Sequence, residues 1–154
     1  MNEDEHMIVM NPVLKASISL ELVRVAISHA EANNWKIAVV VVDPHGVPMA
    51  TARMDNVSPP ILEFALDKAY TAATMRKSTE AFYERMSSSG SLQLGLSNRP
   101  RLVVWGGGMP IIAEGSVVGG IGVSGAQEQD DIACARKALA SQGLAWTAKP
   151  DNET

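Results

Sequence analysis

The segments Trp105-Gly106-Gly107-Gly108-Met109-Pro110 and Val117-Val118-Gly119-Gly120-Ile121-Gly122-Val123-Ser124-Gly125 are the most informative part of this 154-residue sequence. Their glycines alternate with valine and isoleucine, which are typical of strands and rare in flexible linkers. Glycine allows the backbone to approach a neighbour more closely than any other residue does. We therefore predict a hairpin whose glycines line a close-contact surface, occupied either by a ligand or by a packed helix.

Further strands and helices are predicted on both sides of this hairpin. A β-branched run at 36–43 predicts a buried strand, and Pro44-His45-Gly46 predicts a turn that leads into its hairpin partner. Strands joined by short turns form an antiparallel sheet, so we expect one α+β domain over residues 1–154, with helices packed on that sheet. The remaining expectations are a strand at 47–54, helices at about 20–31, 61–76, 79–86 and 127–141, an irregular loop at 87–100, a strand at 102–105, and flexible tails at 1–12 and 148–154. Gly143 is expected to be the C-cap of the last helix.

Composition narrows the classes of function. The net charge is −4 and no basic stripe is visible, which argues against a nucleic-acid partner. Cys134 is the single cysteine, so an internal disulfide is excluded and a reducing compartment fits best. No apolar run reaches the length of a membrane span, and the acidic first ten residues lack the basic start of a signal peptide. We expect a soluble, cytoplasmic protein without a membrane partner.

Four polar residues form the first candidate site. Arg53 and Asp55 lie two apart on a predicted strand and therefore on one face, and Lys68 and Thr71 lie one turn apart on a predicted helix. Together they could hold a small anionic ligand, with Arg53 binding a carboxylate and Asp55 acting as a base. The alternative is an ion-pair network that joins helix to sheet.

The glycine turn is the second candidate. Exposed N–H groups at Gly107-Gly108-Met109-Pro110 could cradle a carboxylate or oxyanion, or the glycines could simply permit a tight turn and close helix packing. Ser124 could add a hydroxyl, although no nucleophile elbow surrounds it. Asp131 lies in an acidic patch that suits the start of a helix, and it is a second candidate base. No metal site is indicated, because no His or Cys pair has zinc-ligand spacing.

Four blocks of sequence, in order over roughly residues 19–143, resemble the GlcG/HbpS family, which is related to the C-terminal domain of PduO-type proteins. This resemblance implies a profilin-like α-β-α sandwich with a central antiparallel sheet, which often assembles into homo-oligomers. The blocks are Val40-Val41-Val42-Asp43 with Arg53-Met54-Asp55, Ala65-Leu66-Asp67-Lys68-Ala69-Tyr70-Thr71-Ala72, Gly107-Gly108-Met109-Pro110-Ile111, and Val118-Gly119-Gly120-Ile121-Gly122-Val123-Ser124-Gly125.

The same resemblance implies that the chain binds a small molecule, haem or a related tetrapyrrole. Among the three histidines, His29 is the one on a predicted helix, and Tyr70, Tyr83 and Cys134 are the other candidate iron ligands. Two alternatives stay open. One is a cofactor-independent isomerase, lyase or hydrolase that acts on a small carboxylate or ring-derived metabolite in catabolism. The other is an accessory subunit that docks a partner enzyme.

Overall fold

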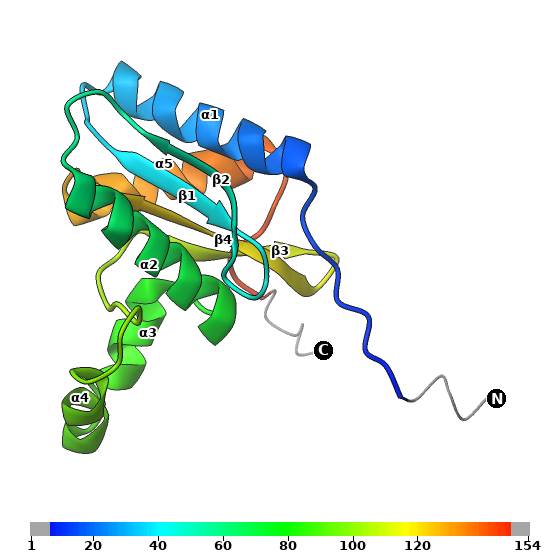
Figure 1. Ribbon diagram of the computed structural model, residues 1–154, viewed down its shortest axis with the longest axis vertical. Helices are drawn as coiled ribbons and strands as arrows, with labels where there is room; N and C mark the ends of the chain where they lie inside the picture. The colour runs from blue at the N-terminus through cyan, green and yellow to red at the C-terminus, as the bar shows by residue number, and fades with distance from the viewer. Residues whose placement is uncertain (1–6, 149–154) are drawn as a thin grey trace, which may run out of the picture.

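The computed structural model describes residues 7–148, and it is a three-layer sandwich built on one sheet (Figure 1). Residues 1–6 and 149–154, which hold His6, half of the first predicted tail and most of the second, lie outside the described residues. The elements are α1 (Ala16–Ala32), β1 (Ala38–Val42), β2 (Pro48–Arg53), α2 (Pro59–Met75), α3 (Thr79–Met86), α4 (Gly90–Leu96), β3 (Gly108–Ala113), β4 (Ser116–Ser124) and α5 (Glu128–Ser141).

The four strands lie in the order β2-β1-β4-β3, and each neighbouring pair is antiparallel. Helices α1 and α5 cover one face of the sheet, and α2 covers the other (Figure 1). The α+β class and the α-β-α sandwich predicted from the sequence are confirmed. Because β1 and β4 occupy the centre of the sheet, both are buried on both faces, as their apolar runs indicate.

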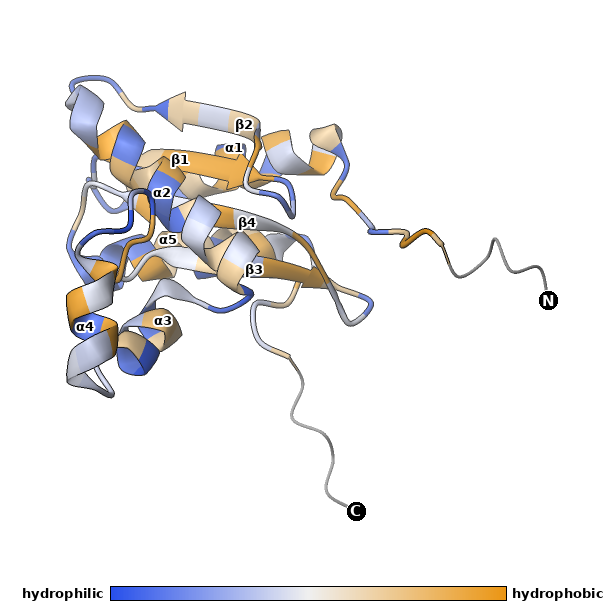
Figure 2. Ribbon diagram, turned by 60° about the horizontal axis from the view of Figure 1, so that its bottom comes forward, coloured by the Kyte–Doolittle hydropathy of each residue, from blue (hydrophilic) through white to orange (hydrophobic). Residues whose placement is uncertain are grey.

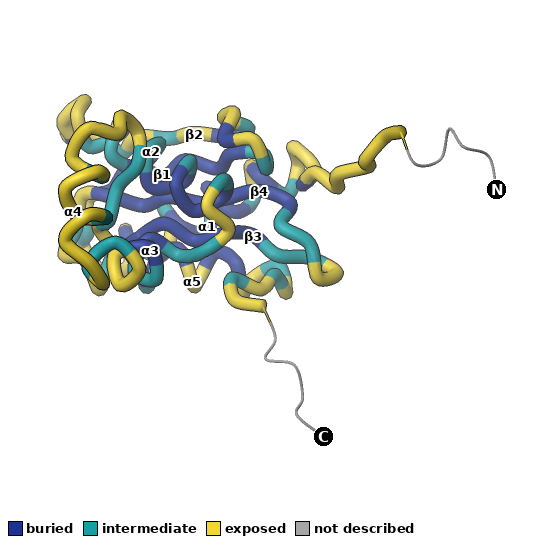
Figure 3. The backbone as a smooth tube through the Cα atoms, turned by 90° about the horizontal axis from the view of Figure 1, so that it is seen from below, coloured by how far each residue is buried: buried dark blue, intermediate teal, exposed yellow. Residues whose placement is uncertain are grey.

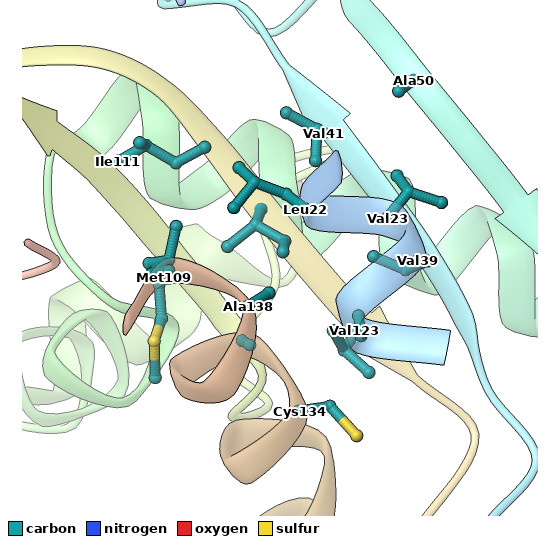
Figure 4. Packing of buried hydrophobic residues seen from close by; sticks show 14 of the residues in the cluster. Leu22, Val23, Val39, Val41, Ala50, Met109, Ile111, Val123, Cys134 and Ala138 are labelled. Atoms are coloured by element: carbon teal, nitrogen blue, oxygen red, sulfur yellow. The ribbon is translucent and has the colours of Figure 1, made fainter. Parts of the chain in front are cut away.

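Side chains of β1 alternate between two separate cores. Val39 and Val41 pack with α1 and α5, where Figure 4 shows them beside Leu22 and Val123. Val40 and its neighbours on the same face pack against α2. In Figure 2 strands β1 and β3 are mostly hydrophobic, and in Figure 3 the centre of the sheet is buried while α4 is exposed.

The glycines of β4 and the alanines of α2 permit an unusually close contact between this helix and the sheet. A Cβ atom added at Gly122 would lie 2.0 Å from the carbonyl oxygen of Ala65, and one at Gly120 would lie 2.6 Å from that of Ala69. No side chain fits into such a space, so glycine is required at both positions. The surface predicted from these glycines is therefore occupied at these two positions by a helix and not by a ligand.

The structure differs from the prediction at one helix start, one strand and one loop. Helix α1 begins at Ala16 rather than after Ser19, whose hydroxyl is buried and donates to the carbonyl oxygen of Lys15. The segment 102–105 is not a strand, because its Val103 N–H donates to the hydroxyl oxygen of Thr71 instead of to a strand. Part of the predicted irregular loop forms helix α4, whose first turn is capped by the Ser89 hydroxyl.

The last helix ends at a glycine, and an exposed segment precedes the first helix. Gly143 follows α5 with a φ of 65°, and the next N–H donates to the carbonyl oxygen of Leu139, so the predicted glycine C-cap is confirmed. Before α1, residues 7–13 form an extended, exposed segment that includes Met7, Ile8, Val9 and Met10 (Figure 3). The homo-oligomer expected from the sequence stays a prediction.

Candidate functional site

A buried ion pair joins the middle of α2 to the first turn of α5. The Lys68 ammonium donates to Asp131 Oδ2 at 3.3 Å and to the carbonyl oxygen of Val123 at 2.9 Å. Both side chains are 4% exposed. The other oxygen of the Asp131 carboxylate accepts the Ala126 N–H at 3.0 Å. Each charge therefore has more than one partner, as buried charges require.

Glycines make room for this pair. Gly107 has a φ of 118°, and a Cβ atom there would lie 3.1 Å from Lys68 Nζ and 2.5 Å from the carbonyl oxygen of Val123. The neighbouring Gly106 N–H donates to Glu128 Oε1 at 2.8 Å, which ties the glycine segment to the start of α5. The glycine run is thus needed because the backbone passes directly beside a buried charge.

Burial dominates the electrostatics of the pair. It raises the pKa of Asp131 to about 6, because loss of water disfavours the carboxylate more than the neighbouring ammonium stabilises it. Burial likewise lowers the pKa of Lys68, against the opposing effect of Asp131. An acid with a pKa near neutrality, held against a cation, is a frequent feature of catalytic sites, although structural ion pairs also produce it.

A depression of about 270 Å³ opens beside the ion pair, and we call it the Lys68 pocket. Ser124, which is 5% exposed, lines it, and among the described residues no group hydrogen-bonds to its hydroxyl. Trp105 forms a half-exposed wall and meets the Phe64 ring edge to face at 5.2 Å. The lining residues are Ile61, Lys68, Trp105, Gly106, Ser124, Gly125, Ala126, Glu128 and Asp131.

The polar cluster expected around Arg53 is divided between separate places. Strand β2 ends at Arg53, and Asp55 follows in an exposed turn, so the two do not share a strand face. The Arg53 guanidinium donates to the carbonyl oxygen of Val57. Because β1 lies between β2 and β4, Arg53 is about 10 Å, or two strand spacings, from the strand that holds Ser124. Lys68 forms its ion pair with Asp131 of α5.

Two further expectations about the site are corrected by burial. Thr71 is buried, and its hydroxyl donates to the carbonyl oxygen of Arg101 and accepts the Val103 N–H, which anchors the segment before β3. Gly107-Gly108-Met109-Pro110 is a buried entry into β3 rather than an exposed turn. The Gly108 N–H donates to Thr79 Oγ1 at 3.0 Å, and Met109 fills the core (Figure 4). The predicted cradle of exposed N–H groups is not present there.

A second depression, of about 370 Å³, is lined mainly by α5, and we call it the α5 groove. His29 reaches it from α1, half-buried, with its ring edge to face with Trp35 at 5.6 Å. Trp146 closes the groove from the segment after α5. The other lining residues, all on α5, are Gln129, Ile132, Ala133, Arg136, Lys137 and Ala140.

The other proposed iron ligands lie outside both depressions. Cys134 is fully buried in the core, and burial raises the pKa of its thiol to about 12 (Figure 4). The Tyr70 ring lies under the Arg101 guanidinium, 3.6 Å from the ring centroid. Tyr83 is exposed on α3. Across residues 7–148, no three His, Cys, Asp or Glu side chains group in a way that could hold a metal ion, and no helix is long and apolar enough to cross a membrane.

Several lining residues were missed in the sequence. Those on α5 follow each other at helical spacing, so the sequence pattern already indicates that they share one helix face. They are Gln129, Ile132, Ala133, Arg136, Lys137 and Ala140. Trp146 gave no such signal, because its position depends on the pairing of Ala145 with Ile112 at the edge of β3. The contact of Glu128 with Gly106 joins residues 22 apart and was equally invisible.

The sequence of this chain is similar to those of several bacterial proteins. The family model described as "Haem degrading protein HbpS-like" matches residues 14–140. An uncharacterized 15.0 kDa protein from the dhaT-dhaS intergenic region of Citrobacter freundii is 36% identical over 107 residues, which are 69% of this chain and 75% of that protein. Protein GlcG of Escherichia coli K12 is 30% identical over 112 residues, 73% of this chain and 81% of GlcG.

Solved structures show the same fold. The haem complex of PduOC superposes with a TM-score of 0.79 at 26% identity and covers 87% of this chain and 98% of that one. The crystal structure of HbpS gives a TM-score of 0.80 at 29% identity and covers 88% of this chain and 94% of HbpS.

Proposed function

Because this chain belongs to the HbpS-like family, we propose that it binds haem, in the α5 groove and with His29 as the iron ligand. The family is described as haem-degrading, and a relative of similar fold has been crystallised with haem. A fold alone does not transfer a ligand, so the proposal depends on whether residues of this chain suit the group.

The imidazole of His29 is the observation that carries the proposal. It lines a depression and is half-buried, so it can reach a ligand there. The other histidine in the described residues, His45, is exposed in the turn between β1 and β2 and lines neither depression. A neutral imidazole nitrogen is the commonest protein ligand of haem iron.

The rest of the groove suits an apolar ring that carries carboxylates. Ile132 and Trp146 offer apolar and aromatic contact to a flat macrocycle. Arg136 and Lys137 bring two positive charges that can pair with the two propionates. The Lys68 pocket suits haem less well, because it is smaller and no His, Cys or Tyr side chain lines it. A bound haem would supply a redox-active iron, while the chain holds and orients it.

A titration of the purified protein with hemin tests the proposal. Wild type is expected to give a saturable Soret shift near one equivalent. His29→Ala should weaken binding by at least about tenfold, since loss of even an indirect metal contact commonly costs 10–100-fold. An Arg136→Ala/Lys137→Ala double variant should weaken binding while leaving the ligation spectrum unchanged.

His45→Ala is the matched control, because it removes an exposed histidine outside the groove. A titration that does not saturate would overturn haem binding altogether. Saturable binding that His29→Ala leaves unchanged would retain haem as the ligand but overturn the α5 groove as its site.

A further inference from the structure

We propose that the Lys68 pocket is a second site, separate from the α5 groove, at which an uncharged carbonyl compound is enolised. In this site Lys68 and Ser124 donate hydrogen bonds to the carbonyl oxygen, and Asp131 moves a proton from the adjacent carbon. The proposal does not depend on haem binding, because the two depressions share no lining residue.

Two donors of the pocket have unused capacity. An ammonium has three N–H groups, and two of those on Lys68 are directed to Val123 and Asp131. Ser124 is nine-tenths buried and lines the pocket, and its hydroxyl has no hydrogen-bond partner among the described residues. No buried side-chain oxygen of the described residues lacks a partner, so the Ser124 hydroxyl is open to solvent and is free to donate to a ligand oxygen in the pocket. Donors that the fold holds in position stabilise negative charge that develops on an oxygen.

Asp131 is placed to act as the base. Each oxygen of its carboxylate accepts one hydrogen bond, from Lys68 or from Ala126, and a carboxylate oxygen can accept more than one. These contacts fix its orientation at the wall of the pocket. Burial raises the pKa of Asp131 to about 6, which is close to the value that favours proton transfer near neutral pH.

Charge and size define the class of substrate. Two carboxylates, Asp131 and Glu128, line the pocket against the single cation Lys68, so an anionic substrate would be repelled. The volume of about 270 Å³ lies below the range usual for drug-sized ligands. Ile61 and Trp105 supply apolar walls. A small aldehyde, ketone or cyclic ketone without charge fits this combination.

The step needs no oxidant or reductant. The Asp131 carboxylate takes a proton from the carbon beside the carbonyl, and the C–H electron pair becomes the new C=C bond. The carbonyl π pair moves onto oxygen, where Lys68 and Ser124 stabilise it. Return of the proton from Asp131 to the same carbon or to a conjugated one restores the carboxylate, so the net result is hydrogen exchange or isomerisation.

Exchange of α-hydrogens in D₂O tests this site with haem-free protein. Hydroxyacetone and cyclohexanone are the probes, and loss of their α-hydrogen signals is followed by proton NMR. Wild type should exchange both probes about 100-fold faster than Asp131→Asn, the usual range for a positioned base. Ser124→Ala should also lose about 100-fold, as is typical for one donor to a developing oxyanion.

Glu84→Gln is the control, because it removes an exposed carboxylate on α3 that neither lines the pocket nor is a charged neighbour of Asp131. This variant should keep the wild-type rate, which accounts for exchange catalysed by surface amines. Thermal melting monitors folding, and if Asp131→Asn does not fold, Ser124→Ala decides, because it leaves the ion pair intact. Wild-type exchange no faster than buffer, or equal in Ser124→Ala, would overturn the proposal.

Discussion

Replacing Gly122 by alanine perturbs the closest contact in the fold. The new Cβ atom would lie 2.0 Å from the carbonyl oxygen of Ala65 and 2.6 Å from the Ala69 nitrogen, both in the backbone of α2. Ordinary contact between such atoms needs about 3.5 Å, so helix and sheet must separate locally by about 1.5 Å. Neither side has a flexible side chain that can rotate away.

The expected loss follows from this geometry. Overpacking a core with one methyl group commonly costs about 1–3 kcal/mol, and rigid backbone on both sides favours the upper end. Separation also weakens the packing of Ala69 and Ala73 against β4. We expect Gly122→Ala to lower the free energy of unfolding by about 3 kcal/mol, and the melting temperature by about 6–12 °C for a chain of this size.

Urea unfolding, followed by tryptophan fluorescence, measures the effect. Gly95→Ala in α4 is the matched control, because an added Cβ atom there meets nothing within 4 Å. Alanine is the better helix former, so this control should lose no stability. A loss below about 1 kcal/mol for Gly122→Ala would refute the close packing of α2 on β4.

Three further predictions concern buried groups. Lys68→Met should lower the free energy of unfolding by about 3–5 kcal/mol, because Asp131 stays buried without its cation, and Lys68→Met/Asp131→Leu should recover most of this loss in urea unfolding. The pKa of Asp131 is raised on folding, so the native state binds its proton more tightly than the unfolded chain does between about pH 4 and 6. The contribution of Asp131 to the free energy of unfolding therefore declines as pH rises through this window. The charged neighbours of Asp131 are Lys68, Glu128 and Asp130. Asp131→Asn should flatten this part of the curve when the free energy of unfolding is measured against pH. Burial raises the pKa of Cys134 to about 12, so iodoacetamide should alkylate it only as fast as the protein unfolds, measured by mass spectrometry; rapid labelling of the folded protein would contradict its placement in the core.

Much of the fold could be predicted because its signals are local. The β-branched run of β1 and the turn at Gly46 predict a hairpin, and the pattern of α5 with Gly143 predicts a helix and its end. The prediction of a strand failed where a backbone N–H bonds to a side chain distant in sequence instead of to a neighbouring strand. The segment 102–105 has strand-like residues, yet Val103 bonds to Thr71 of α2.

The candidate site could be predicted only in its parts. Lys68, Ser124 and Asp131 were each identified as residues able to carry chemistry, but no pattern in the sequence selected Asp131 over Asp55 as the carboxylate beside Lys68. The predicted cluster instead joined Arg53 and Asp55 to Lys68 and Thr71. The strand order β2-β1-β4-β3 instead brings β4 and α5 beside Lys68, and sequence separation carries no information about that order.

The sequence by itself determined the class of the fold, the strands and helices with strong periodicity, and the glycines that a close contact requires. Periodicity and backbone freedom are properties of neighbouring residues, so they can be read along the chain. Only the tertiary structure decided what fills that contact and which charge pairs with Lys68. Gly107 meets the ammonium, Gly122 meets the backbone of α2, and Lys68 binds Asp131 63 residues away, since burial in the fold leaves that carboxylate as its ionic partner.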